Sequence, residues 1–213
     1  MENEKYLKDI SEIKNMMNRS SRFISLSGLS GVFAGCYAIL GAIAARFIIS
    51  DSIDHNYDYD ATASEYINSE LVQELFLIAI AVLVLAIGTA IFLTTRKAKK
   101  NELKIWDSTS KRLVINFFAP LAAGGLFCLV LLQYGIIGLI APCLLIFYGL
   151  ALIHASKYTF ADLKGLGYSN LILGLLATQF IGFGLYFWAV GFGLFHIIYG
   201  IWMHNKYDRK NAE

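Results

Sequence analysis

"LVQELFLIAIAVLVLAIGTAIFLTT", residues 71–95, decides the fold of this chain. Glu74 is the only charged residue in the stretch, and the basic segment RKAKK follows it at residues 96–100. An α-helix rises about 1.5 Å per residue, so an apolar run of this length can cross the roughly 30 Å of hydrocarbon in a lipid bilayer. The stretch therefore predicts a transmembrane helix that ends at a basic surface.

The whole chain has the composition of a membrane protein. Of its 213 residues, 57% are hydrophobic and 16% are charged, and the mean hydropathy is +0.56, whereas soluble domains carry about 25% charged residues. Five further apolar blocks have the length of a membrane-spanning helix: 23–49, 113–132, 136–155, 166–183 and 186–204. Strands of a membrane β-barrel alternate polar and apolar residues, and these blocks are continuously apolar. We therefore expect an all-α integral membrane protein whose six transmembrane helices occupy residues 23–205.

Short, glycine-containing linkers join the later blocks. Only QYG, residues 133–135, separates the third block along the chain from the fourth, and GFG at 182–184 marks the boundary between the last two. Linkers this short allow little more than a turn, and glycine is the residue that tolerates the conformations of tight turns. We expect three helical hairpins, each formed by two consecutive spans.

The basic residues predict how the chain is threaded. All but one of the 18 Lys and Arg residues precede the first span, follow the last, or lie in the loops at 96–112 and 156–165. By the positive-inside rule these segments are cytoplasmic, so both termini and the tail at 206–213 are expected inside. The loop at 50–70 holds six acidic residues and no Lys or Arg, and is expected outside. Arg46, the exception, can reach the interface with its long side chain.

The N-terminal segment, residues 1–22, has the pattern of an amphipathic helix. Tyr6, Ile10, Ile13 and Met17 fall on one helical face, with charged residues opposite. Such a helix can lie in the membrane interface, or it can dock against a helix of a partner protein. We expect no nucleic-acid partner, because the membrane topology already accounts for the basic loop and no recognition scaffold accompanies it.

One sequence motif occurs twice. IFYGLALIHASKY at 146–158 matches IIYGIWMHNKY at 197–207, and the entry segment KRLVINFFAPLAAGG at 111–125 aligns more faintly with SRFISLSGLSGVFAG at 21–35. The matches suggest three hairpins of one ancestral kind. Within the motif, His154 and His204 suit an interfacial belt, although a paired imidazole site for a metal or haem is the alternative.

His196 is expected near the middle of the last span, at a depth where an ionisable side chain is a functional candidate. Tyr148 and Asn170 are possible partners from neighbouring spans. The site is either a neutral imidazole that is hydrogen-bonded within the bundle, or the lining of a cavity in a small transporter or channel.

The outer loop contains DHNYDYDATASE at 54–65, which resembles an EF-hand calcium loop. The residues at ligand positions are Asp54, Asn56, Asp58, Asp60 and Glu65. Tyr59 stands where the calcium loop needs glycine for a sharp turn, so a weak metal site competes with a simple solvated acidic loop. We expect no cofactor.

SSRFISLSGLSGV at the start of the first span and LIFYGLALIHASKY at the end of the fourth resemble an uncharacterised family of six-span bacterial inner-membrane proteins. The resemblance implies a multi-pass protein of the bacterial inner membrane and brings no established activity. Some relatives bear a carotene-cleaving oxygenase label, which implies iron bound by several His residues within the membrane. The four His residues of this chain fall at different depths, and we identify no such site.

The function that we expect is therefore a non-catalytic membrane module that acts with a partner protein, and a homo-oligomer is also considered. Gly31 and Gly35 form a GxxxG pattern in the first span, which lets helix backbones approach closely in lipid. The alternative is a small transporter or channel with a cavity near His196. A membrane enzyme, or a metal or haem protein, ranks third.

Overall fold

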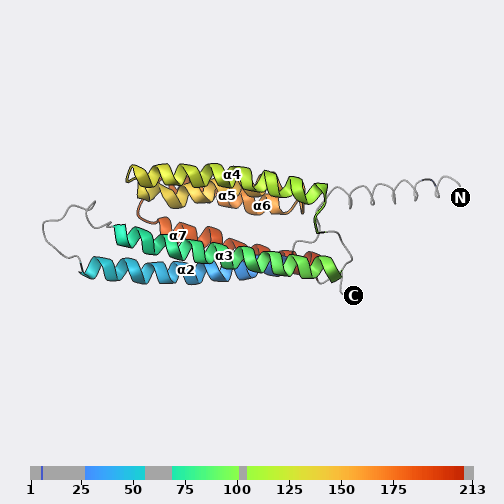
Figure 1. The fold of residues 1–213 in the computed structure, drawn as a ribbon, viewed down its shortest axis with the longest axis horizontal. Coiled ribbons are helices and arrows are strands. Elements are labelled where there is room, and N and C mark those ends of the chain that lie inside the picture. The colour runs from blue at the N-terminus through green and yellow to red at the C-terminus, as the bar shows by residue number, and fades with distance from the viewer. Residues whose placement is uncertain (1–5, 7–26, 56–68, 101–104, 209–213) are drawn as a thin grey trace.

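The computed structural model describes Tyr6 and residues 27–55, 69–100 and 105–208 (Figure 1). Of these residues, 88% are helical and none lies in a strand. The fold class is therefore all-α, as predicted. The helices α2, α3, α4, α5 and α6 span Gly28–His55, Ser69–Lys100, Ser108–Gln133, Ile140–Ala155 and Leu163–Ala177. The last span combines α7 (Gly184–Trp188), the π-helix η2 (Ala189–Leu194), α8 (Phe195–Met203) and the π-helix η3 (His204–Asp208).

Five segments in this part of the chain are long and apolar enough to cross a membrane, and α6 is a shorter apolar helix. Its 15 residues extend about 22 Å, less than the hydrocarbon thickness. The predicted span at 166–183 was therefore too long at its end. After Ala177 the backbone N–H groups of Gln179 and Phe180 bond three residues back, to Leu176 and Ala177, so the α-helix ends there. The chain then turns through Gly182, whose φ is 99°.

Other helices are longer than the apolar blocks that predicted them. α4 begins at Ser108, before the block at 113–132, because Asp107 caps it: the Asp107 carboxylate accepts a hydrogen bond of 2.7 Å from the Ser110 backbone. It ends before Gly135, whose φ of 70° lies in the left-handed region that favours glycine. The predicted turn at 133–135 is thus present.

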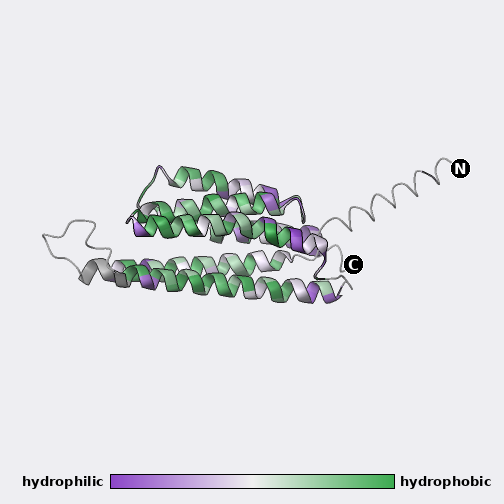
Figure 2. Ribbon diagram, turned by 45° about the horizontal axis from the view of Figure 1, so that its top comes forward, coloured by the Kyte–Doolittle hydropathy of each residue, from purple (hydrophilic) through white to green (hydrophobic). Residues whose placement is uncertain are grey.

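The helices form two layers (Figure 1). α4, α5 and α6 lie in one layer, and α2, α3 and the last span lie in the other. α2 packs against α3 and α4 packs against α5, as expected for the first two hairpins. The third pair differs from the prediction, because α6 packs mainly against α5 and α8 packs mainly against α2. Figure 2 shows hydrophobic residues along most of each helix, with hydrophilic residues gathered towards the ends.

Glycines explain why α6 packs against α5. A Cβ on Gly149 of α5 would lie 2.7 Å from the Gly167 carbonyl oxygen and 2.7 Å from the Leu171 nitrogen. A Cβ on Gly174 would lie 2.9 Å from the Ile146 nitrogen. Real Cβ atoms do not come this close to backbone, so the two helix backbones touch only because these positions lack a side chain. In lipid, this close approach replaces the hydrophobic effect as the source of helix association.

The crossing of α8 over α2 is built in the same way. A Cβ on Gly200 would lie 2.6 Å from the Val32 nitrogen and 2.8 Å from the Gly28 carbonyl oxygen. A Cβ on Gly35 would lie 3.0 Å from the Ile197 nitrogen. Gly35, which the sequence placed in a GxxxG pattern, is thus a contact between helices.

The two crossings have the same register. In one crossing the helix that carries Gly200 contacts three residues of α2: Gly28, Val32 and Gly35. In the other, the helix that carries Gly149 contacts three residues of α6 with the same spacing: Gly167, Leu171 and Gly174. On the opposing helices, Ile197 and Ile146 each lie three residues before the Tyr-Gly glycine and meet the last glycine of the triplet. The Tyr-Gly motif that occurs twice in the sequence therefore marks two equivalent helix crossings.

We predict that Gly149→Ala and Gly200→Ala each lower the free energy of unfolding by about 1–3 kcal/mol, because the added methyl group meets backbone that cannot move without separating the helices. Gly165→Ala in α6 is the matched control. No atom lies within 4 Å of a Cβ at Gly165, so this change leaves the stability equal or slightly higher. Unfolding in detergent micelles measures all three variants, and equal effects at Gly149 and Gly165 would contradict the crossing.

Candidate functional site

His196 lies in the first turn of α8, where its side chain reaches between the two layers. It is only 6% exposed. Its Nδ1 lies 2.9 Å from the Gly191 carbonyl oxygen, and its Nε2 lies 2.6 Å from the Tyr148 hydroxyl. The structure thus brings together His196 of the last span and Tyr148 of α5, which the sequence proposed as partners.

These two contacts define the state of the ring. A carbonyl oxygen can only accept a hydrogen bond, so Nδ1 must carry a proton and donate to Gly191. In the neutral imidazole Nε2 then has a lone pair, and the Tyr148 hydroxyl donates to it. Both ring nitrogens are satisfied without a ligand. The pair also connects α5 in one layer with the last span in the other.

The π-helix η2 provides the carbonyl that His196 uses. A π-helix pairs residues five apart instead of four, which is the spacing between Gly191 and His196. Gly191 has no room for a side chain, because a Cβ there would meet the Leu145 side chain and lie 2.8 Å from Asn170 Oδ1. The irregular turn is therefore packed closely against both α5 and α6.

Asn170, the third residue that the sequence proposed for this site, is fully buried in α6. Its Nδ2 donates to the Leu166 carbonyl over 3.0 Å. Its Oδ1 faces Gly191 and accepts no hydrogen bond from any residue that the structure describes. Asn170 thus lies beside the carbonyl that binds His196, but it contacts neither His196 nor Tyr148 by a hydrogen bond.

A recess of about 200 Å³ opens between α6 and α8. Its lining is mostly apolar, and His196 is not part of it: the residues are Leu166, Ser169, Phe195, Ile198, Tyr199 and Trp202. The Tyr199 hydroxyl is buried and has no hydrogen-bond partner among the described residues. Tyr199 is the residue that corresponds to Tyr148 in the doubled motif, so the two copies differ in what their tyrosines bind.

The residues predicted to bind calcium remain without a test. Asp54 lies in the last turn of α2, and its side chain is outside the described part of the structure, as are Asn56, Asp58, Asp60 and Glu65. Across residues 27–51, 71–100 and 105–208, no three His, Cys, Asp or Glu side chains gather in a way that could hold a metal ion.

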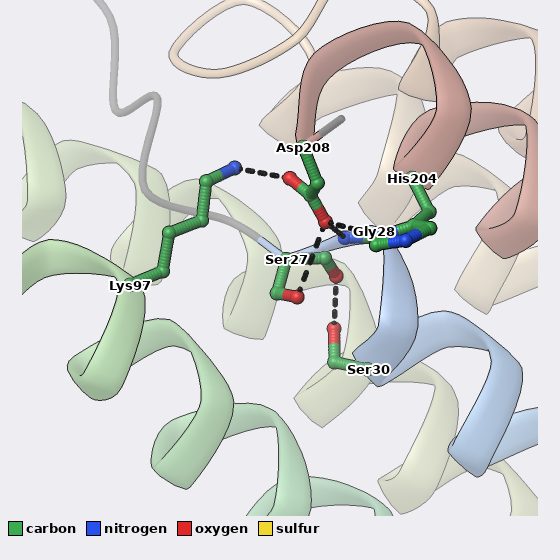
Figure 3. Close-up of polar contacts among 6 residues, drawn as sticks. All are labelled: Ser27, Gly28, Ser30, Lys97, His204 and Asp208. Atoms are coloured by element: carbon green, nitrogen blue, oxygen red, sulfur yellow. Dashed lines mark hydrogen bonds and ion pairs between the residues drawn. The ribbon is translucent and has the colours of Figure 1, made fainter. Parts of the chain in front are cut away.

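A second polar cluster lies where α2 begins and the last span ends (Figure 3). Asp208 Oδ2 accepts hydrogen bonds from the Gly28 backbone at 3.0 Å, from the Ser27 hydroxyl at 3.4 Å and from His204 Nδ1 at 3.1 Å. Asp208 Oδ1 pairs with Lys97 Nζ at 2.6 Å. One carboxylate therefore joins the start of α2, the end of α3 and η3.

Asp162 ties the loop between α5 and α6 to the same end of the bundle. Its Oδ2 accepts from Lys206 Nζ at 2.6 Å and from the Tyr207 hydroxyl at 2.5 Å. The ring of Phe160 packs on Tyr207 with centroids 4.2 Å apart, and Lys97 Nζ lies 5.6 Å from the centre of the Phe160 ring. We call this end of the bundle, held by Asp162 and Asp208, the polar end.

Burial raises the pKa of Asp162, but the hydrogen bonds from Lys206 and Tyr207 lower it by more, so the pKa of this carboxyl lies below its ordinary value. Asp162 is therefore ionised whenever the surrounding solution is near neutral. The ion pair with Lys206 is consequently present under ordinary conditions.

The sequence did not identify Asp208 or Asp162 as important. The tail was predicted to begin at residue 206, whereas the helical structure continues through Asp208. The available signal was the spacing of His204 and Asp208, four residues apart, beyond the second copy of the doubled motif. The partners Gly28 and Lys97 lie far away in the sequence and could not be read from that spacing.

No family model, curated protein or solved structure matches the chain. The resemblance to a bacterial inner-membrane family therefore stays an expectation.

We predict that His196→Leu lowers the free energy of unfolding by about 1–3 kcal/mol, because it leaves the Tyr148 hydroxyl and the Gly191 carbonyl without partners in an apolar layer. His196→Gln keeps a donor and an acceptor and costs less. The double variant His196→Leu with Tyr148→Phe costs less than the sum of the single changes, because both remove one shared hydrogen bond. Unfolding in micelles measures the cycle, with exposed Tyr186→Phe as the control. Additive effects would mean that the pair is not coupled.

The lowered pKa of Asp162 predicts the direction of a pH effect. A carboxyl whose pKa is lower in the folded protein stabilises the fold fully above its ordinary pKa of about 3.9 and loses that contribution as the pH falls through the folded value. Wild type should exceed Asp162→Asn in stability near neutral pH, and the difference should shrink below about pH 4. The same comparison in a Lys206→Met background should show a smaller difference. A difference that stays constant from pH 7 to pH 3 would contradict the ion pair.

Proposed function

We propose that the chain is a multi-pass protein of the bacterial inner membrane with both termini in the cytoplasm, and that it acts as a non-catalytic module which holds a partner protein. The observation that carries the proposal is the polar end. There Asp208 fixes the residues from which α2 starts, Ser27 and Gly28, to α3 and to the end of the last span. Whatever the N-terminal segment binds is thereby attached to a firmly joined part of the bundle.

The charges of the described residues support this orientation. All the described Lys and Arg residues except Arg46 belong to the helix ends and loops at the polar end: Arg96, Lys97, Lys99, Lys100, Lys111, Arg112, Lys157, Lys164 and Lys206. The positive-inside rule assigns such an end to the cytoplasm. Placing it there also puts the amphipathic segment at 1–22 on the side where a cytoplasmic partner could reach it.

The hydrogen bonds at His196 support a packing role for the one ionisable residue deep in the last span. Both of its nitrogens already have partners within the protein, and the pair with Tyr148 joins the two layers. A site that moves a proton or binds a cation would need at least one of these groups to exchange its partner. The intramembrane polar groups thus serve the rigid attachment that a holding module requires.

One feature favours the alternative, a small transporter or channel. π-helical turns are frequent at functional sites, and η2 lies beside the unpaired Oδ1 of Asn170. This alternative is tested by measuring solute flux across proteoliposomes that contain wild type or His196→Gln. Flux that is present in wild type and lost in the variant, with unchanged protein stability, would establish the transporter in place of the module.

The partner is tested by photo-crosslinking in living cells, with the crosslinking residue placed at Ile10 or Ile13 on the apolar face of the N-terminal segment. Lys8 and Glu12, which lie four residues apart on the face opposite Ile10, are the matched controls. We expect one discrete protein adduct from the crosslinker at Ile10 and at Ile13. The yield of that adduct should be at least tenfold lower from the control positions. Adducts with lipid alone would mean that the segment lies in the membrane interface, and would contradict the partner.

A further inference from the structure

A third pair of helices carries residues that align with those of the two glycine crossings, but these helices do not form a crossing. Each formed crossing joins the second span of one predicted hairpin to the first span of the next: α5 to α6, and α8 back to α2. The remaining combination is α3 with α4. These two helices are not among the pairs that pack together, and they lie in different layers (Figure 1).

The sequence of α4 aligns with α2 at the contact positions. In the alignment of 111–125 with 21–35, Ala122 corresponds to Val32 and Gly125 corresponds to Gly35. Gly88 is the single glycine of α3, and it lies eight residues before Arg96, as Gly149 lies eight residues before Lys157. We therefore align Gly88 with Gly149, and through the repeated motif with Gly200. The third pair of helices thus has glycine at two of the three positions where each formed crossing has it, at Gly88 and Gly125.

These faces are open. No atom lies within 4 Å of a Cβ built on Gly88 or on Gly125, whereas the corresponding positions in the formed crossings meet backbone at 3.0 Å or less. Leu85, which corresponds to Ile146 and Ile197, is 52% exposed. An exposed glycine weakens a helix relative to alanine, and in lipid its usual benefit is close contact with another helix.

The formed crossings show which surface fits each open face. A helix like α4 lies against a helix like α3, antiparallel, with Gly125 near Leu85 and Ala122 near Gly88. Both surfaces are present in every copy of the chain. When two copies have the same orientation in one membrane, α3 of the first runs antiparallel to α4 of the second, as the crossing requires. We propose that two copies form a dimer in which α3 of each copy packs against α4 of the other.

The symmetry of this arrangement explains why it would stop at two copies. In a two-fold dimer the α3 face of the first copy meets the α4 face of the second, and the reverse contact forms at the same time. Each copy then has all three of its glycine crossings occupied. Additional copies have no open face of this kind to bind.

The third crossing differs from the others at one end. Phe118 stands where the formed crossings have Gly28 and Gly167, and it would oppose Phe92, four residues beyond Gly88. Both rings are exposed in the single copy. Backbone contact is therefore confined to the part of the crossing that contains Gly88 and Gly125, and the two phenylalanines pack ring to ring where the helices diverge.

Paired cysteines test the dimer. In a chain whose Cys36, Cys128 and Cys143 are replaced, one tagged copy carries Gly88→Cys and a differently tagged copy carries Ala122→Cys. Oxidation in the native membrane should link the two tagged chains, because in a formed crossing a Cβ on Gly149 lies 3.1 Å from the Leu171 Cα, which is within the reach of a disulfide. Leu83→Cys, on the other side of α3, replaces Gly88→Cys as the control and should give at least tenfold less product.

A single chain that carries both Gly88→Cys and Ala122→Cys separates the dimer from a closure within one molecule. The dimer predicts covalently linked pairs of chains, whereas linkage within each chain, or no linkage above the Leu83 control, would overturn the proposal. Gly88→Leu should reduce the dimer fraction, counted by photobleaching in liposomes, at least tenfold, and Gly165→Leu, at an open position on α6, should not. An undiminished dimer in Gly88→Leu would also overturn it.

Discussion

Close approach of helix backbones at glycine is the constraint on which the rest of the structure depends. Lipid tails are as apolar as the helix surfaces, so burial alone gives these helices little reason to associate. Contact has to come from dispersion between surfaces that fit, and the best fit is backbone against backbone. Gly149 with Gly167, and Gly200 with Gly28, provide that fit, and a Cβ at any of the four would collide with the opposing helix. The division into two layers follows, because each of these contacts joins spans from different predicted hairpins.

Polar side chains then hold the helices in the arrangement that the glycine contacts make possible. Inside the bundle, His196 and Tyr148 join the layers through one hydrogen bond, and the π turn at 189–194 supplies the carbonyl that determines the tautomer. A short loop in the chain holds the adjoining ends of α5 and α6 together. At the polar end Asp208 does the same for the last span and α2, because its carboxylate accepts a hydrogen bond from the first backbone N–H of α2. For the holding module that we propose, this attachment fixes the point at which the chain enters α2.

The sequence predicted those features that depend on local composition. Apolar blocks located the helices, and the glycines at 135 and 182 marked turns. It also proposed Tyr148 and Asn170 as possible partners of His196, because a deep imidazole needs a polar neighbour, and only Tyr148 forms the hydrogen bond. The predicted end of α6 was wrong, since the change to three-residue backbone bonding after Ala177 occurs within an apolar run and is not visible in the composition. The packing of α6 against α5 could not be derived, because it depends on how Gly149 of one helix meets Gly167 of the other. The role of Asp208 could not be derived either, because its partner Gly28 lies 180 residues away in the sequence. The doubled motif indicated that two segments are alike, but not which helix each one packs against.

Solid-state NMR of the protein in lipid bilayers tests the central claim most directly. With ¹³C at the glycine Cα atoms and ¹⁵N at the isoleucine backbone, through-space transfer reports which glycines lie against which isoleucines of another helix. Equivalent crossings predict two matching signals of similar strength, one between Gly174 and Ile146 and one between Gly35 and Ile197. A third signal, between Gly167 and Ile153, has no isoleucine counterpart because His204 occupies the matching position. A signal from only one of the two matching pairs, or from neither, would contradict the shared register.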